Sequence, residues 1–123
     1  MIALQSHYAG LGERFGVAMR PLPVEAPRLI GMNRALANRL GLEIAERPEA
    51  ALAALFSGNR LPEGARPVAM AYAGHQFGNF VPQLGDGRAV LLGECRGSDG
   101  RLHDIHLKGA GATPFSRGGD GRS

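Results

Sequence analysis

The chain has 123 residues, a net charge of +3 and one cysteine, and 44% of its residues are hydrophobic. This length suits one domain or part of one, and no run of eighteen apolar residues predicts a transmembrane helix. A single cysteine, Cys95, excludes an internal disulfide framework and a cysteine-based zinc site. No secretory signal is expected, because the first residues lack a basic start followed by an apolar core. Together these features favour the cytoplasm.

The positive charge is spread along the chain. Thirteen arginines and one lysine lie between Arg14 and Arg122, and residues 72–123 carry six basic and five acidic side chains. Nucleic-acid-binding proteins usually concentrate basic residues in a patch or stripe. We therefore expect no nucleic-acid partner.

The first 71 residues predict a helical N-terminal extension. Pro21 and Pro23 interrupt regular structure early in this part. Residues 28–32 suggest a short edge strand. Asn33 then predicts a helix N-cap, followed by a helix over residues 34–40, because its side chain can accept from the first free amides of the helix.

Glycines mark the expected ends of the helices. Gly41 suits the position after the first helix. A second helix is predicted to begin at Pro48, to run through Phe56 and to end near Gly58, since proline is tolerated in a first turn. Residues 68–72 suggest a further short helix.

Residues 72–123 form a glycine-rich part that holds twelve of the nineteen glycines and the only lysine, Lys108. Residues 89–92 predict a strand and residues 96–100 a turn. Residues 102–108 alternate, so Asp104, His106 and Lys108 are predicted to share one face of a second strand. The two strands predict an antiparallel hairpin.

The residues before this hairpin suggest phosphate binding. Gly85 and Gly87 offer backbone amides with no side-chain bulk, and Arg88 offers a bidentate contact to phosphate oxygens. They precede the hairpin and can fold over whatever Lys108 reaches. An alternative remains open, because Asp-Gly dipeptides such as Asp86-Gly87 are ordinary turn sequences. The P-loop and dinucleotide-binding glycine patterns are absent.

Metal and nucleophile chemistry receive less support from the pattern. His103 and His106 lie on one predicted strand but point to opposite faces, so they do not form a ligand pair. Ser116 and Cys95 have no evident base partner. We expect no metal site and no nucleophilic catalysis from these residues.

Six motifs in order resemble the selenoprotein O family, whose members are protein adenylyltransferases with a protein-kinase-like fold. The motifs occupy residues 72–78, 82–88, 92–94, 106–111, 113–117 and 119–122. The resemblance implies that ATP binds in a reversed orientation and that AMP is transferred to Ser, Thr or Tyr hydroxyls of protein substrates, with release of pyrophosphate. The implied ATP contacts are Gly85, Gly87, Arg88, Lys108, Asp120 and Gly121.

The resemblance also limits what this chain is expected to do. The family continues for several hundred residues beyond the Gly-Asp-Gly-Arg motif that ends here at Arg122. The general base and the ligands of Mg²⁺ or Mn²⁺ are implied to lie beyond Ser123. No catalytic and no metal-binding residue is therefore expected within the chain, and we expect it to be inactive by itself.

The predicted fold class is α+β: a partial kinase-like N-lobe, with short helices followed by an antiparallel hairpin or sheet and a glycine-rich loop. We expect a single incomplete domain over residues 1–123, with a helical extension over 1–71 and an ATP-binding hairpin region over 72–123. Partners are expected to be ATP and protein substrates, without nucleic acid or membrane. Two other hypotheses remain: a non-catalytic fragment, and a small interaction module whose glycines only form turns.

Overall fold

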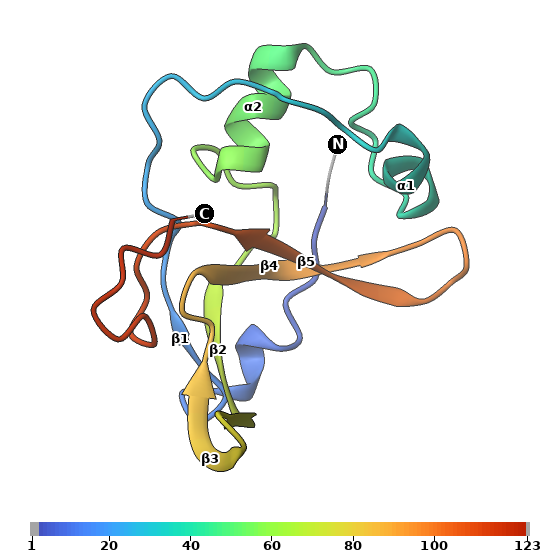
Figure 1. Cartoon of the computed structure of the whole chain (residues 1–123). Helices are drawn as coiled ribbons and strands as arrows, with labels where there is room; N and C mark the ends of the chain where they lie inside the picture. The colour runs from blue at the N-terminus through green and yellow to red at the C-terminus, as the bar shows by residue number, and fades with distance from the viewer. Residues whose placement is uncertain (1–2, 123) are drawn as a thin grey trace.

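An antiparallel sheet with two short helices on one face makes up the computed structural model, which describes residues 3–122 (Figure 1). The predicted α+β class is confirmed at this level. The elements in chain order are a 3₁₀ turn η1 (Ala9–Leu11), β1 (Gly16–Ala18), α1 (Arg34–Arg39), α2 (Glu49–Ser57), β2 (Val68–Gln76), β3 (Asn79–Gly85), β4 (Ala89–Arg96) and β5 (Leu102–Lys108).

Strand β2 organises the sheet. The strand order is β1-β2-β4-β5, with β3 paired to β2 as well, and the pairings between these five strands are antiparallel. The first residues of β2 lie between β1 and β4, since Val68 pairs with both Ala18 and Leu91. The second half of β2 pairs with β3, and this hairpin projects from the rest of the sheet (Figure 1).

Both helices begin and end within one residue of the predicted positions. The Asn33 side chain accepts a hydrogen bond from the Leu36 amide at 2.9 Å, so it caps α1. Pro48 precedes the first residue of α2, and Gly58 ends it in a left-handed conformation with φ 82°. The strand predicted over residues 28–32 is wrong: no strand pairs there, and Leu29 and Met32 instead pack against the helical core.

The helix predicted over residues 68–72 is also wrong, because these residues begin β2. Val68 and Ala69 are buried. A strand covered on both sides has a continuous apolar run, and such a run resembles a helix when only the sequence is read. Strand β3 was not predicted, and neither was β1. Residues 3–71 therefore contain both α-helices together with β1 and the start of β2.

The predicted β4–β5 hairpin is confirmed, and β4 is longer than expected. Its register joins Ala89 to Lys108 at one end and Arg96 to Leu102 at the other, with a bulge between Leu91 and Gly93. In β5, Ile105 and Leu107 pack toward the core, whereas Lys108 is exposed on the opposite face. This alternation matches the predicted division of faces.

Two hydrophobic clusters hold the layers together. One joins Ala37 and Ile44 to Leu52 and Leu55 of α2. The other lies between the sheet and the helical layer, and its buried members are Leu4, Leu92 and Cys95, with partly buried neighbours from both layers. Burial raises the pKa of the Cys95 thiol, which leaves it protonated at neutral pH.

The N-terminal segment is anchored on β4 by a buried carboxylate. Glu94 is 5% exposed, and its two carboxylate oxygens accept hydrogen bonds from the amides of His7 and Tyr8, at 3.1 and 3.0 Å. The backbone of Gln5 exchanges two hydrogen bonds with that of Glu94. These contacts fix the segment before η1 across the sheet.

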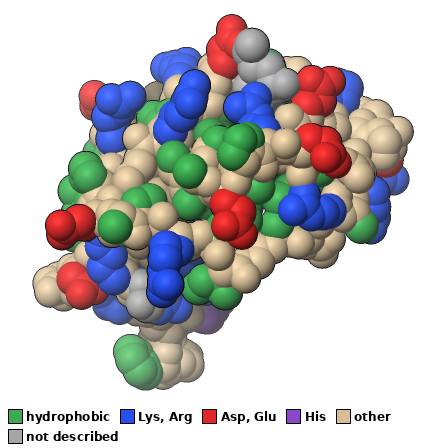
Figure 2. Space-filling view, turned by 90° about the horizontal axis from the view of Figure 1, so that it is seen from above, with side chains coloured by type: hydrophobic (Ala, Val, Ile, Leu, Met, Phe, Trp, Pro, Cys, Tyr) green, Lys and Arg blue, Asp and Glu red, His purple; other side chains and the backbone are tan. Residues whose placement is uncertain are grey.

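The helical side of the molecule carries mixed charge. Seen from above, basic and acidic side chains are interspersed with hydrophobic ones, and no stripe of one sign crosses this face (Figure 2). Among residues 3–122, no helix combines the length and apolar character that crossing a membrane requires.

Candidate functional site

A cavity of about 930 Å³ lies where the β2–β3 hairpin, the turn between β3 and β4, and the segment after β5 meet. The hairpin and the turn form one wall, and residues 114–122 form most of the other. The lining residues are Tyr72, Gln76, Gln83, Leu84, Gly85, Gly87, Arg88, Pro114, Phe115, Ser116, Arg117, Gly119, Asp120, Gly121 and Arg122.

Five of the six residues singled out as ATP contacts line this one cavity. Gly85 is the last residue of β3, Gly87 and Arg88 come from the turn after it, and Asp120 and Gly121 come from the segment after β5. These two groups are brought together although more than thirty residues separate them in the sequence.

Lys108 is the exception, because it does not line the cavity. It is the last residue of β5, it is exposed, and it pairs with Ala89, directly after the turn. The next residue, Gly109, donates its amide to the Arg88 carbonyl at 2.6 Å. Lys108 therefore lies next to the turn without facing the cavity directly.

A buried carboxylate holds the turn against β2. Asp86 is 8% exposed; its carboxylate accepts from the Met70 amide at 3.0 Å and from the Tyr72 hydroxyl at 3.3 Å. The Asp86 amide donates back to the Met70 carbonyl at 2.9 Å. Because a buried charge is stable only when it is hydrogen-bonded, these contacts determine where the turn begins.

The same carboxylate influences two tyrosines. Burial raises the pKa of Tyr72, and the negative charge of Asp86 and its hydrogen bond raise it further. Burial and the Asp86 charge also raise the pKa of Tyr8. Both hydroxyls therefore stay protonated at neutral pH, and the Tyr72 hydroxyl remains a hydrogen-bond donor beside the cavity.

Gly85 is required for close packing. A Cβ atom at Gly85 would lie 2.4 Å from Cγ of Phe115 and 2.7 Å from the Met70 carbonyl oxygen. At Gly87 the nearest atom would be 3.1 Å away, the Phe115 carbonyl oxygen. The Phe115 ring thus fills the space that the missing side chain of Gly85 leaves, and it joins the two walls of the cavity.

The opposite wall of the cavity depends on a close contact between two glycines, Gly111 and Gly121. Gly121 is buried with φ 71°, and its carbonyl accepts from the Gly111 amide at 3.1 Å. Asp120 holds the turn before Arg122, because its carboxylate accepts the Arg122 amide at 3.0 Å. The Arg122 guanidinium donates to the Pro23 carbonyl at 3.3 Å, which joins this wall to the N-terminal part.

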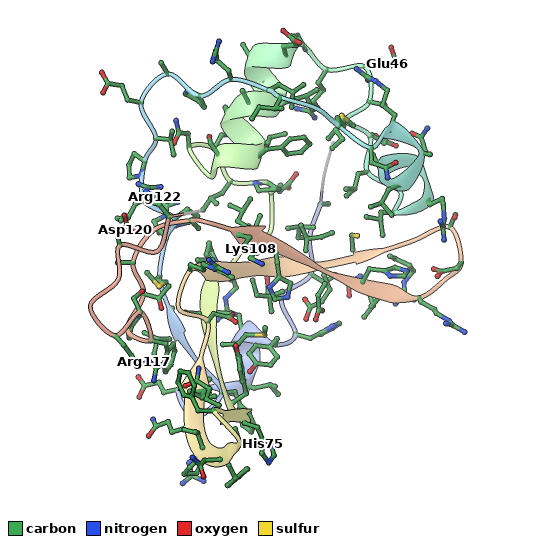
Figure 3. The ribbon with its side chains drawn as sticks, viewed as in Figure 1. Glu46, His75, Lys108, Arg117, Asp120 and Arg122 are labelled. Carbon is green, nitrogen blue, oxygen red and sulfur yellow. The ribbon has the colours of Figure 1, made fainter. Side chains whose placement is uncertain are left out.

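The charge of the cavity is mainly positive. Of the described residues that line it, Arg88, Arg117 and Arg122 are basic and Asp120 is acidic. Figure 3 shows Asp120 and Arg122 side by side near the C-terminal end, Arg117 farther along the same loop, and His75 at the tip of the projecting hairpin. Exposed guanidinium groups around a cavity with glycine amides form a suitable site for an anion.

Several lining residues were not assigned to the site from the sequence. Tyr72 and Phe115 were given no role of their own, and Ser116 was considered only as a nucleophile. Arg117 and Arg122 were recognised only as parts of motifs. The one available signal was their position in a segment already rich in glycine and polar residues, and that signal does not separate a cavity wall from an ordinary loop.

The described residues contain no group of three or more His, Cys, Asp and Glu side chains that could hold a metal ion. His103 is instead paired with Asp99 in the turn after β4, with His103 Nε2 3.0 Å from Asp99 Oδ2. His106 lies on the opposite, exposed face of β5. The two histidines therefore do not converge, as the alternation predicts.

Comparison with known proteins gives one consistent family. The family model described as protein adenylyltransferase SelO matches residues 1–123. A protein of Agrobacterium fabrum named protein nucleotidyltransferase YdiU is 61% identical over 123 residues, which is 100% of this chain and 25% of the relative.

Proteins with the same name occur in other bacteria. The one from Alkalilimnicola ehrlichii is 64% identical over 116 residues, 94% of this chain and 24% of the relative. The one from Rhizobium meliloti is 62% identical over 116 residues, with the same coverage of 94% and 24%. The chain thus spans about a quarter of the length of the curated relatives that it matches.

Proposed function

The chain belongs to the SelO family of protein adenylyltransferases, and we propose that it forms the ATP-binding part of such an enzyme. The observation that carries the proposal is the convergence of Gly85, Gly87, Arg88, Asp120 and Gly121 on one cavity. The names of the relatives, which are protein nucleotidyltransferases, support a nucleotide as the ligand.

In this proposal each residue has a distinct role. The amides around Gly87 bind phosphate oxygens, and Arg88 adds a bidentate charged contact. Lys108 supplies a compact positive charge from the end of β5 once a phosphate extends beyond the cavity. Asp120 and Gly121 shape the opposite wall, since the Asp120 carboxylate is engaged by the Arg122 amide.

The proposed reaction is transfer of AMP to a Ser, Thr or Tyr hydroxyl of a protein substrate. The hydroxyl oxygen forms a bond to the α-phosphorus of ATP, the bond from that phosphorus to the bridging oxygen breaks, and pyrophosphate leaves. The hydroxyl proton passes to a general base that we place in the three quarters of the relatives' length that this chain does not cover.

Mg²⁺ or Mn²⁺ is proposed to accompany ATP. The described residues do not offer a ligand set for such an ion, so we assign its ligands to the part of the relatives that this chain does not cover.

We likewise propose a kinase-like arrangement in which the turn and the β4–β5 hairpin with Lys108 correspond to an N-lobe. We propose no nucleic-acid partner, because basic and acidic side chains are interspersed on the helical side and form no basic stripe there. We propose the cytoplasm as the location.

The first test is titration of the chain with ATP, followed by amide NMR. We expect saturable shifts at Gly85, Gly87 and Lys108. An Arg88→Ala variant should bind ATP roughly 10- to 150-fold more weakly, because a hydrogen bond to a charged group contributes about 1.5–3 kcal/mol. Arg101→Ala, an exposed arginine in the turn before β5, serves as the control and should bind normally. No shift at millimolar ATP would favour an interaction module instead.

The second test addresses the transferred group. This chain would be joined to the remaining part of the Agrobacterium relative, and protein labelling from α-labelled and γ-labelled ATP would be compared. We expect label only from the α position, with matching release of pyrophosphate. Label from the γ position alone would indicate a kinase and would contradict the proposed transfer, although nucleotide binding would stand.

A further inference from the structure

Two hydroxyl groups hold consecutive peptide groups of the turn between β3 and β4. Thr113 Oγ1 donates to the Asp86 carbonyl, and Ser116 Oγ donates to the Gly87 carbonyl. The donors come from the segment after β5 and the acceptors from the turn; of these four residues, Gly87 and Ser116 line the cavity. The two hydrogen bonds therefore hold the turn against the segment after β5.

Each hydroxyl is also fixed by a hydrogen bond that it accepts. Ser116 Oγ accepts from the Thr113 amide at 2.7 Å, and Thr113 Oγ1 accepts from the Phe115 amide at 3.0 Å. A hydroxyl has one proton, so while it accepts from a backbone amide its proton is directed to the carbonyl. Replacing either hydroxyl by a methyl group would remove both the hydrogen bond that it donates and the one that it accepts.

Holding a carbonyl also fixes the direction of the amide in the same peptide group. In a trans peptide the carbonyl and the amide point in opposite directions. The Asp86 carbonyl shares its peptide group with the Gly87 amide, and the Gly87 carbonyl shares its group with the Arg88 amide. With both carbonyls held by hydroxyls, these two amides point away from Thr113 and Ser116, and neither donates a hydrogen bond to another described residue.

Amides from consecutive residues that point the same way form a concave site for an anion. Gly87 and Arg88 line the cavity, and the exposed Arg88 side chain adds positive charge there. A glycine turn by itself has many accessible conformations, because glycine lacks steric restriction. The hydroxyl bonds select one of them.

We propose that Thr113 and Ser116 are positioning residues for phosphate binding: they orient the Gly87 and Arg88 amides toward the phosphate groups of a nucleoside triphosphate. This inference rests on the proposed function of the cavity. It predicts that the two hydroxyls contribute to the binding of phosphates and contribute nothing to the binding of the nucleoside.

The experiment compares Thr113→Val, Ser116→Ala and the double variant with the unchanged chain. Thr113→Ser and Ser116→Thr keep the hydroxyls and are the rescue variants. Ser98→Ala is the matched control, because Ser98 Oγ also donates to a backbone carbonyl, that of Arg39 at 3.1 Å, in a turn outside the cavity lining. ATP, inorganic tripolyphosphate and adenosine are the three probes, and thermal unfolding is measured in parallel.

We expect each single variant to bind ATP and tripolyphosphate about fivefold more weakly, and the double variant tenfold or more, as net hydrogen-bond contributions indicate. Adenosine affinity should stay unchanged, and the hydroxyl-keeping variants should bind as the unchanged chain does. The Gly87 and Arg88 amide resonances should lose most of their ATP-induced shift in the double variant.

Other results of the same measurements would overturn the inference. Equal losses for ATP and adenosine, or a lower unfolding temperature with normal ATP affinity, would reduce the hydroxyls to a structural role and overturn the inference. If the double variant does not fold, the unchanged chain decides: ATP binding without shifts at the Gly87 and Arg88 amides also overturns it. If the unchanged chain binds neither ATP nor tripolyphosphate, the proposed function fails first and the inference falls with it.

Discussion

Gly111 and Gly121 approach each other so closely that Gly121 has no room for a side chain, and Leu22 leaves none at Gly111. The Gly111 amide donates to the Gly121 carbonyl at 3.1 Å, and a Cβ atom on Gly121 would lie 1.9 Å from the Gly111 carbonyl oxygen. A Cβ atom on Gly111 would lie 2.6 Å from Cδ1 of Leu22. This contact closes the segment after β5 into the second wall of the cavity, so it provides the first prediction.

Gly121→Ala should destabilise the chain more than Gly118→Ala. Both glycines have positive φ, 71° and 87°, so both alanines incur backbone strain of roughly 1–2 kcal/mol. Only Gly121 adds a steric conflict, because nothing lies within 4 Å of a Cβ at Gly118. We expect a loss at Gly121 that is roughly twice as large or more, measured by urea unfolding. Equal losses in the free energy of unfolding would show that the second wall accommodates a Cβ atom at Gly121 without extra cost.

Gly85→Ala should disturb the cavity, whereas Gly87→Ala should be tolerated better. Neither position has positive φ, so the difference is steric: 2.4 Å to Phe115 Cγ at Gly85, against 3.1 Å to the Phe115 carbonyl oxygen at Gly87. We expect Gly85→Ala to lower both stability and ATP affinity.

A double-mutant cycle identifies the conflict at Gly85. Adding Phe115→Ala to Gly85→Ala should recover part of the loss, because the ring is removed while the contact with the Met70 carbonyl, 2.7 Å, remains. Strictly additive free energies of unfolding would mean that the ring is not the obstacle.

Lys108→Ala should weaken ATP binding about tenfold or more and leave stability unchanged. The side chain is exposed at the end of β5, so its removal opens no space in the core. Lys108→Arg should restore little of the affinity, because a guanidinium fork replaces a compact charge. The measurement is ATP titration alongside thermal unfolding. Unchanged affinity in Lys108→Arg would contradict the argument for a compact charge.

The tyrosines should titrate at unusually high pH. Tyr8 and Tyr72 are the only tyrosines and the chain has no tryptophan, so tyrosinate absorbance reports on them directly. Their folded pKa values are raised, Tyr72 by burial and then by Asp86. Because both pKa values are raised in the folded state, the two protonated tyrosines contribute to the free energy of unfolding. This contribution is fully present below the ordinary pKa of about 10 and is lost as pH rises through the folded pKa.

Asp86→Asn isolates the contribution of the charge. The amide oxygen of asparagine still accepts from the Met70 amide, but the negative charge beside Tyr72 is gone. We expect the Tyr72 pKa to move down toward its ordinary value, with burial keeping it raised in part. Asp120→Asn, at an exposed carboxylate, should leave the tyrosine titration unchanged. An unaltered titration in Asp86→Asn would assign the whole shift to burial.

Local sequence was sufficient for the elements whose ends are set by neighbouring residues. Asn33 caps α1 through its own side chain, and Gly58 ends α2 in a conformation that favours glycine. The β4–β5 hairpin was predictable because its two strands are joined by a short turn and β5 alternates cleanly between its faces. These features depend on contacts within a few residues.

Tertiary structure alone decided the rest. Residues 68–72 become a strand because β1 and β4 pair with residues 68–70 and β3 pairs with residues 71 and 72. The apolar run of these residues carries no period that separates strand from helix. The sequence identified the glycines around Gly87 and the Asp120-Gly121 pair, but their meeting at one cavity depends on long-range contacts such as Thr113 with Asp86. Burial of the Asp86 carboxylate depends on the same packing, and an Asp-Gly turn looks alike whether it is buried or exposed.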